Sequence, residues 1–175
     1  MTDQKQNPSK PLVGIVMGSD TDLPIMTDTA RTLKEFGVPF EVEITSAHRS
    51  PARTAEYART AVERGLKAIV VGAGGASHLA GIIAAETILP VIAVPIANTP
   101  LSGMDALLST VQMPSGVPVA VMAIGKAGAV NAAIFAAQII ATADGRLAER
   151  LRRHKETLAR VLAEKAEKLK KEFSV

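Results

Sequence analysis

Cysteine and tryptophan are absent from the 175-residue chain, and aromatic residues make up only 3% of it. Without cysteine the chain can form neither a disulfide framework nor a thiolate zinc site, which argues against a secreted scaffold and favours a cytoplasmic protein. The low aromatic content, with no stripe of alternating basic and aromatic residues, leaves little surface on which nucleic-acid bases stack. The sequence therefore disfavours nucleic-acid binding.

Long apolar runs are also missing. Among the runs without a charged residue, 87–104 contains three prolines, and 127–143 is too short and too polar to span a bilayer. The N-terminal MTDQKQNPSKP has no apolar stretch of signal-peptide type. We therefore expect no membrane span, and we interpret residues 1–11 as a flexible leader.

Charge is distributed unevenly. Residues 144–175 carry ten Lys and Arg against six acidic residues, whereas residues 1–143 carry ten against eleven, so the formal net charge of +3 comes from the C-terminal segment. Between residues 68 and 125 the only charged side chains are Glu86 and Asp105. Because water-facing helices are rarely so poor in charge, this pattern predicts that a subunit interface covers part of the segment, and hence a homo-oligomer.

The elements alternate between strand and helix patterns. Five short β-branched segments, mostly bounded by Gly or Pro, are predicted strands: 12–17, 40–45, 68–72, 90–94 and 118–123. The first helix is predicted from Asp22, placed as its N-cap, to Phe36, and the second from Pro51 to Arg64. Strands that alternate with helices indicate a parallel sheet covered on both faces, so the predicted fold is a flavodoxin-like three-layer αβα sandwich.

Two further helices are predicted after the last strand. Residues 126–143 are apolar on most of the helix circumference, as expected of a helix buried on several sides. Residues 144–173 place leucines and Phe173 along one face between many charges, which is typical of an amphipathic helix that docks on a partner. Packing of this helix on its own domain remains an alternative.

In open parallel sheets, ligands bind outside the carboxyl ends of the strands. GSDTD (18–22) follows the first strand there, and its backbone N–H groups and helix dipole can receive an anion. Ser19 offers a hydroxyl to a phosphate, and Asp22 offers a carboxylate to ribose hydroxyls. The alternative is that Asp22 is only an N-cap and Ser19 only a turn residue.

The loops after the second and third strands carry the chemically active side chains. In SAHRSP (46–51), Arg49 can clamp a phosphate and His48 can transfer a proton near neutral pH, unless both are simply solvated surface residues. In AGGASHL (73–79), Gly74 and Gly75 allow a ligand close to the backbone, and His78 either contacts the ligand or caps a helix. A loop, helix and loop over 101–116 would border the same pocket or pack between subunits.

Several motifs of other enzyme classes are absent. The chain has no GxGxxG, GxxxxGK[ST] or GxSxG motif, and its three histidines do not have HExxH spacing. We therefore expect a phosphorylated small molecule to be handled by acid–base chemistry, with no metal, dinucleotide or other cofactor.

Five ordered motifs resemble the PurE family of purine biosynthesis: VMGSDTD, SAHRSP, GAGGASHLAG, LSGMDALLSTVQMPSGVPV and AIGKAGAVNAA. The resemblance runs from about Val13 to Ala143. It implies a catalytic α/β domain over 12–143, an octamer, a C-terminal helix (144–175) that reaches a neighbouring subunit, and no metal or organic cofactor.

The resemblance also implies roles for individual residues. It assigns Ser19 and Arg49 to the substrate phosphate with Ser46 nearby, Asp22 to the ribose hydroxyls, and His48 to acid–base catalysis. Gly74, Gly75 and Leu79 would line the aminoimidazole and its carboxylate, with His78 close by. The implied reaction moves a carboxylate from the exocyclic nitrogen of an aminoimidazole ribonucleotide to ring carbon C4.

Two alternatives stay open at this point. A related branch of the family carboxylates aminoimidazole ribonucleotide directly with CO2, but it is usually described with lysine where this chain has Arg49. A nucleotide-sensing flavodoxin-like module without turnover would need the phosphate loop but no acid–base at position 48. GSDTD and PIANTPLSG (95–103) both depart from the usual family pattern. The departure in PIANTPLSG leaves open which contacts that loop makes with the substrate.

Overall fold

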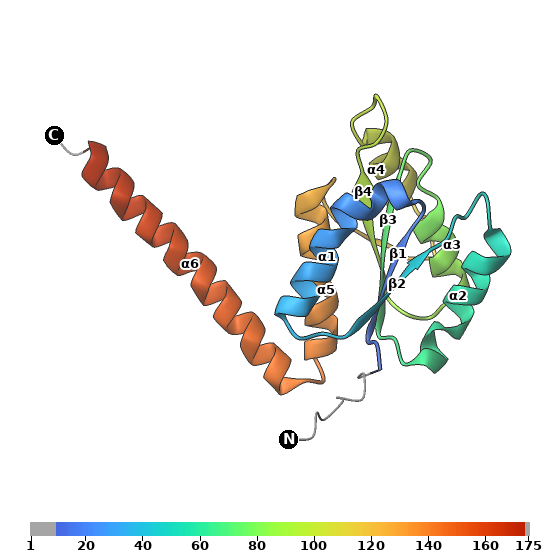
Figure 1. The fold of residues 1–175 in the computed structure, drawn as a ribbon, viewed down its shortest axis with the longest axis horizontal. Coiled ribbons are helices and arrows are strands. Elements are labelled where there is room, and N and C mark those ends of the chain that lie inside the picture. The colour runs from blue at the N-terminus through green and yellow to red at the C-terminus, as the bar shows by residue number, and fades with distance from the viewer. Residues whose placement is uncertain (1–9, 174–175) are drawn as a thin grey trace, which may run out of the picture. The chain divides into compact units, whose positions relative to one another are not determined.

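The computed structural model describes residues 10–173, so the predicted leader lies almost entirely outside the described residues. The chain forms two compact units, the first ending at Ile139 and the second beginning at Ile140. The first unit is the α/β sandwich (Figure 1). The second contains the end of helix α5 (Lys126–Ala141) and the whole of helix α6 (Gly145–Phe173). Among the described residues no helix is long and apolar enough to cross a membrane.

All five strands of the sandwich run parallel in one sheet, in the order β2-β1-β3-β4-β5. This is the flavodoxin-like order, and it confirms the predicted fold. The strands are β1 (Val13–Met17), β2 (Phe40–Ile44), β3 (Ala68–Gly74), β4 (Val91–Ile96) and β5 (Ala120–Val121). The central strands β1, β3 and β4 are almost completely buried, whereas every residue of the edge strand β2 is at least partly exposed.

Helices cover both faces of the sheet (Figure 1). Helices α1 and α5 lie on one face, where the Thr29 hydroxyl donates to the Ala129 carbonyl, and α2 and α3 lie on the other. The helices are η1 (a short 3-10 helix, Asp20–Asp22), α1 (Leu23–Glu35), α2 (Pro51–Arg64), α3 (Leu79–Glu86), α4 (Met104–Val111), α5 (Lys126–Ala141) and α6 (Gly145–Phe173). The predicted bounds of α2 agree with the structure, because Pro51 begins it and Gly65, with φ +98°, ends it.

The fifth strand is shorter than the sequence predicts. The prediction covered 118–123, but only Ala120 and Val121 pair with β4. Pro118 has no N–H for the ladder, and the strand has a neighbour on one side only. The apolar pattern of this segment therefore reflects partial burial at the sheet edge rather than a full strand.

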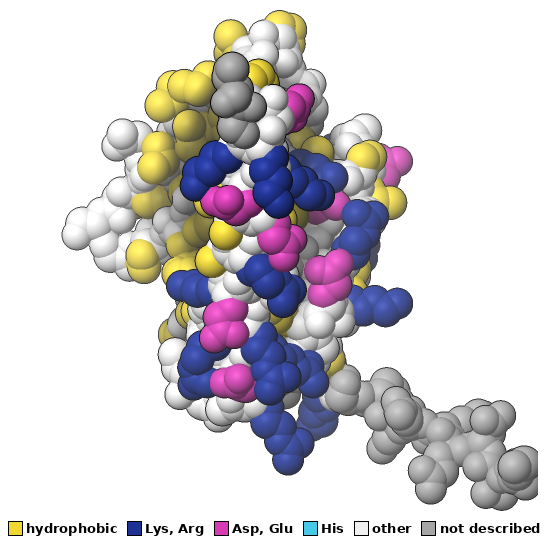
Figure 2. Space-filling model, turned by 90° about the vertical axis from the view of Figure 1, so that its left-hand side faces the viewer, with side chains coloured by type: hydrophobic (Ala, Val, Ile, Leu, Met, Phe, Trp, Pro, Cys, Tyr) yellow, Lys and Arg dark blue, Asp and Glu magenta, His cyan; other side chains and the backbone are white. Residues whose placement is uncertain are grey.

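Helix α6 is amphipathic, as predicted. Its first turn is capped by Asp144, whose Oδ1 accepts from the N–H groups of Arg146 and Leu147 at 2.9 and 3.1 Å. Within this helix Leu147 and Leu151 are buried, while the later apolar residues Leu158, Leu162, Leu169 and Phe173 are exposed. Figure 2 shows basic and acidic side chains in alternation along α6.

Candidate active site

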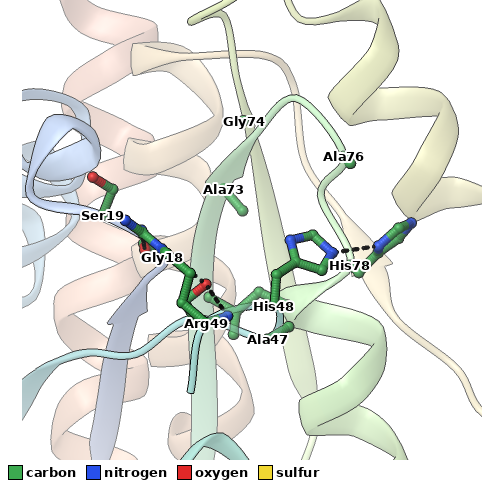
Figure 3. Close-up of a pocket in the computed structure, with 11 residues that line it drawn as sticks. Gly18, Ser19, Ala47, His48, Arg49, Ala73, Gly74, Ala76 and His78 are labelled. Carbon is green, nitrogen blue, oxygen red and sulfur yellow. Dashed lines mark hydrogen bonds between the residues drawn. The ribbon is translucent and has the colours of Figure 1, made fainter. Parts of the chain in front are cut away.

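A cleft of about 250 Å³ opens at the carboxyl ends of β1, β2 and β3. The chain leaves β1 toward β2 on one side and returns to β3 on the other, so the cleft lies at the topological switch point of the sheet. Three loops supply its walls, one from each strand (Figure 3). The lining residues are Gly18, Ser19, Ser46, Ala47, His48, Arg49, Ala73, Gly74, Ala76, His78 and Leu79.

The loop after β1 is folded by a reciprocal cap. Ser19 Oγ accepts from the N–H of Thr21 at 3.4 Å, and Asp22 Oδ2 accepts from the N–H of Ser19 at 3.1 Å. Asp22 occupies the predicted N-cap position of α1, which begins at Leu23, but its side chain closes η1 and makes no cap bond to α1.

Asp22 is almost completely buried, with 2% of its surface exposed. Burial raises the pKa of this carboxyl above its usual 3.8, and the N–H of Ser19 offsets part of that effect. Its second oxygen, Oδ1, has no hydrogen-bond partner among residues 10–173. An unpaired buried carboxylate oxygen beside a cleft is suited to accept a hydrogen bond from a ligand hydroxyl.

The turn after β2 carries both His48 and Arg49. The Arg49 guanidinium reaches across to the first loop, where Nη2 donates to the Gly18 carbonyl at 2.8 Å. Its backbone N–H and Nε contact Ser46 Oγ at 3.2 and 3.4 Å. Figure 3 shows the guanidinium beside Gly18 and Ser19. A cation is thus placed beside the loop for which the sequence predicts anion binding.

His48 faces His78 across the cleft (Figure 3). Its Nε2 lies 2.8 Å from Nδ1 of His78, and the two rings meet edge to face at 83°. His78 also takes the N-cap position of α3, as predicted, although its side chain forms no cap bond. Since only one of the two facing nitrogens can carry the proton of this bond, the pair needs at least one ring nitrogen that accepts.

The end of β3 lies close to the loop after β4. A Cβ on Gly74 would lie 2.0 Å from Oδ1 of Asn98, so only glycine leaves room for that amide. Gly75 has φ +56°, a left-handed conformation that also favours glycine. Leu79, 3% exposed, closes the floor of the cleft.

The structure brings seven of the predicted site residues into this cleft. They are Ser19, Ser46, His48, Arg49, Gly74, His78 and Leu79. Asp22 and Gly75 belong to the same loops but do not line the cleft, and neither does any residue of the loop 95–103, although Asn98 of that loop lies against Gly74. Sequence reasoning missed Gly18, Ala47, Ala73 and Ala76, which carry no reactive side chain. Among the described residues no group of three His, Asp or Glu side chains is placed to hold a metal ion.

Comparisons with known proteins agree with this geometry. The family model described as AIR carboxylase matches residues 12–161. The chain is 56% identical over 160 residues to the N5-carboxyaminoimidazole ribonucleotide mutase of Pyrococcus horikoshii, covering 91% of this chain and 89% of that protein. It is 52% identical over 160 residues to the N5-carboxyaminoimidazole ribonucleotide mutase of Bacillus subtilis, covering 91% and 99%.

A solved structure has the same fold. The crystal structure of Treponema denticola PurE is similar with a TM-score of 0.82 and 30% sequence identity, covering 91% of this chain and 99% of that one. The matches extend over nearly the full length of each relative. The sandwich, the cleft at its switch point and these similarities together place the chain in the PurE family, whose sequence model is that of AIR carboxylase.

Proposed function

We infer that the chain is an N5-carboxyaminoimidazole ribonucleotide mutase, an isomerase of purine biosynthesis, and that the cleft is its active site. The observation that carries this assignment is the juxtaposition of His48 with the Arg49 and Ser19 loop. One wall of the cleft is suited to a sugar phosphate and the other to proton transfer. Relatives that are about half identical over nearly their whole length bear the mutase name.

The substrate is anchored at its phosphate and ribose. Ser19 and Arg49 bind the phosphate, with the N–H groups at the start of η1 adding to the positive potential. Asp22 accepts from the ribose hydroxyls through Oδ1, which has no partner among the described residues. Ser46 orients Arg49. Gly74, Gly75 and Leu79 lie along the aminoimidazole and its carboxylate, with His78 beside the reacting end.

His48 supplies and recovers one proton. Protonated His48 donates to the exocyclic nitrogen while the bond from this nitrogen to the carboxylate carbon breaks, which releases CO2. Ring carbon C4, which is electron-rich because it is part of an enamine, then attacks the CO2 carbon. Neutral His48 finally removes the hydrogen from C4. The proton balance closes on one imidazole, so the chain's own residues need no second acid or base.

We also propose that the protein is a cytoplasmic homo-oligomer, with the octamer that the family resemblance implies. The charge-poor segment exposes several large apolar side chains, among them Ile88 at 91% and Leu101 at 62%. The apolar residues of α6 are also exposed. Large apolar side chains exposed in a charge-poor segment favour a subunit interface. In this proposal the C-terminal helix packs on a neighbouring subunit.

A substrate test separates the three candidate functions. The purified protein is given N5-carboxyaminoimidazole ribonucleotide, and separately aminoimidazole ribonucleotide with bicarbonate at low CO2, and the C4-carboxylated product is measured by chromatography. The mutase converts the first substrate rapidly and the second hardly at all. Rapid conversion of the second would instead identify a direct carboxylase, and binding without conversion of either would identify a sensing module.

A further inference from the structure

A cluster of hydroxyl groups lies beneath the turn that carries His48 and Arg49. Thr45 follows β2, Ser50 precedes α2, and Thr54 lies one turn into α2. Thr45 is 2% exposed and Thr54 is completely buried. Buried hydroxyl groups cost free energy unless they are hydrogen-bonded, so the partners of these groups show what they hold in place.

The three hydroxyls bond to one another and to the backbone of the turn. Thr45 Oγ1 lies 2.9 Å from Thr54 Oγ1 and 3.2 Å from Ser50 Oγ. The Ser50 hydroxyl donates to the Ser46 carbonyl at 3.2 Å. One arrangement of the three protons therefore runs in a single direction, from Thr54 through Thr45 and Ser50 to Ser46, in which each bond polarises the next.

These bonds close the turn around His48. The N–H of Ser50 donates to the Ser46 carbonyl at 2.9 Å, and the N–H of Ser46 donates to Ser50 Oγ at 3.0 Å. The Ser46 hydroxyl in turn accepts from the backbone N–H of Arg49. A continuous set of hydrogen bonds thus links the buried hydroxyl of Thr54 to both ends of the five-residue turn.

Ser50 is free for this task because it does not cap its helix. A serine at the N-cap usually accepts from a backbone N–H of the first helical turn, yet the Ser50 side chain makes no such bond. Pro51 at the first helical position lacks an N–H, which removes one of the donors that a cap would otherwise satisfy. The hydroxyl therefore points back into the turn.

In a second arrangement of the protons, Thr54 Oγ1 accepts from Thr45 and donates to the Ser50 carbonyl at 3.2 Å, a bond that many helical threonines make to the preceding turn. A purely structural role would end there. The additional bond to Thr45 joins α2 to the residue that follows β2. The turn that carries His48 connects these same two elements.

We propose that Thr54, with Thr45 and Ser50, is a positioning residue that holds His48 in the orientation required for proton transfer. This inference rests on the proposed function, because it assigns a task to the turn that carries the acid–base. Arg49 keeps its separate bond to the Gly18 carbonyl, so loss of the Thr54 hydroxyl affects the histidine more than the phosphate anchor.

The test compares Thr54→Val, which removes the hydroxyl at nearly constant shape, with Thr54→Ser, which retains it. Thr29→Val is the matched control, since Thr29 is also completely buried and also donates one hydroxyl bond, to the Ala129 carbonyl on the other face of the sheet. We expect Thr54→Val to lower kcat for N5-carboxyaminoimidazole ribonucleotide by about tenfold or more, with a smaller change in KM. Thr54→Ser restores most of kcat, and Thr29→Val lowers Tm but not kcat.

The proposal is overturned if Thr54→Val keeps wild-type kcat, if Thr54→Ser is equally impaired, or if Thr29→Val loses as much kcat. Failure of the wild-type protein to convert the substrate would instead refute the proposed function. In that case the NMR resonance of the His48 ring decides the inference. It shifts in Thr54→Val and stays in place in Thr29→Val if the hydroxyls hold the turn, and it is unchanged in both if they do not.

Discussion

His48 and Arg49 are adjacent in the sequence but are held by different partners. His48 contacts His78 of the third loop, whereas Arg49 contacts Gly18 of the first loop and Ser46 of its own turn. Their side chains therefore point to opposite walls of the cleft (Figure 3). This division separates the proposed proton transfer from the proposed phosphate binding, so we expect substitutions at the two positions to have different kinetic effects.

Replacement of His48 by Asn tests the proton cycle. Asn fills similar space and can hydrogen-bond, but it cannot take up and return a proton at neutral pH. We expect kcat to fall by at least about 100-fold, the usual contribution of a general acid–base, while the dissociation constant measured by calorimetry stays close to that of the wild type. Arg49→Ala is the companion variant, and we expect it mainly to weaken substrate binding, because the contact with the phosphate is lost. Near-normal turnover by His48→Asn would remove the histidine from the mechanism.

Asp22 predicts a pH dependence of stability. Burial raises the pKa of its carboxyl in the folded protein above the 3.8 of the unfolded chain, so the folded state holds this proton more tightly. The stabilisation from the protonated form is complete below pH 3.8 and is lost as the pH rises through the folded pKa. We therefore expect the free energy of unfolding of wild type, relative to Asp22→Asn, to decrease over that range.

Urea unfolding at a series of pH values measures this difference. Glu35→Gln is the control, because Glu35 is an exposed acidic residue at the last position of α1. A difference in unfolding free energy between wild type and Asp22→Asn that does not change with pH would contradict a raised pKa for Asp22.

Asp22→Asn should also weaken substrate binding, since the amide replaces the carboxylate proposed for the ribose hydroxyls.

Residue types and their order predicted the loops of the site but not the contacts within them. His48, Arg49 and Ser19 stand out in the sequence because they follow strand patterns at positions where parallel sheets bind ligands. The bond between His48 and His78 joins residues 30 positions apart, and the bond between Thr45 and Thr54 joins two hydroxyls that look like ordinary strand and helix residues. Side-chain contacts of this kind depend on tertiary packing, which no local pattern contains.

At the scale of elements, the sequence prediction was accurate where proline and glycine mark the ends of an element and less accurate where strand pairing sets them. Helix α2 has a proline at its start and a glycine at its end, so its bounds followed from backbone chemistry alone. Strand β3 continues two residues beyond its predicted end, to Gly74, because β4 pairs with it up to that point. The prediction was least accurate at β5, where the partner strand lies on one side only.

Two helical glycines give a prediction about how α5 is placed. A Cβ on Gly128 of α5 would lie 1.7 Å from the carbonyl oxygen of Ala123, a backbone atom that cannot move aside. Gly128→Ala should therefore lower the free energy of unfolding, by about 1–3 kcal/mol as in other overpacked sites. Denaturant titration followed by circular dichroism measures the change.

Gly81 of α3 is the matched control. A Cβ there would meet only the end of the flexible Met113 side chain, at 3.4 Å. Gly81→Ala should be neutral or should stabilise the protein by up to about 1 kcal/mol, because alanine has the higher helix propensity. Equal effects of the two substitutions would show that the contact of α5 with the segment before it is not constrained as the structure indicates.

At the scale of the whole molecule, two parts of the chain expose large apolar side chains although their content of charged residues differs. The segment from 68 to 125 contributes two charged side chains, whereas α6 alternates basic and acidic residues along its length (Figure 2). Yet α6 also exposes Leu158, Leu162, Leu169 and Phe173. A helix with this many exposed apolar side chains gains free energy when a partner covers them, at roughly 25 cal/mol per Å² of apolar surface.

Ile88, in the turn after α3, tests whether association of subunits covers the charge-poor surface. Its side chain is 91% exposed in the single chain, so an aspartate there is tolerated by the fold but would be costly if an interface buried it. We expect Ile88→Asp to lower the molar mass measured by light scattering, and Leu169→Asp to do so separately if α6 also contributes. Lys34→Gln changes the net charge by the same one unit on exposed α1 and should leave the mass unchanged. A wild-type protein that is monomeric at all concentrations would refute the oligomer, and unchanged mass in Ile88→Asp would place its interface elsewhere.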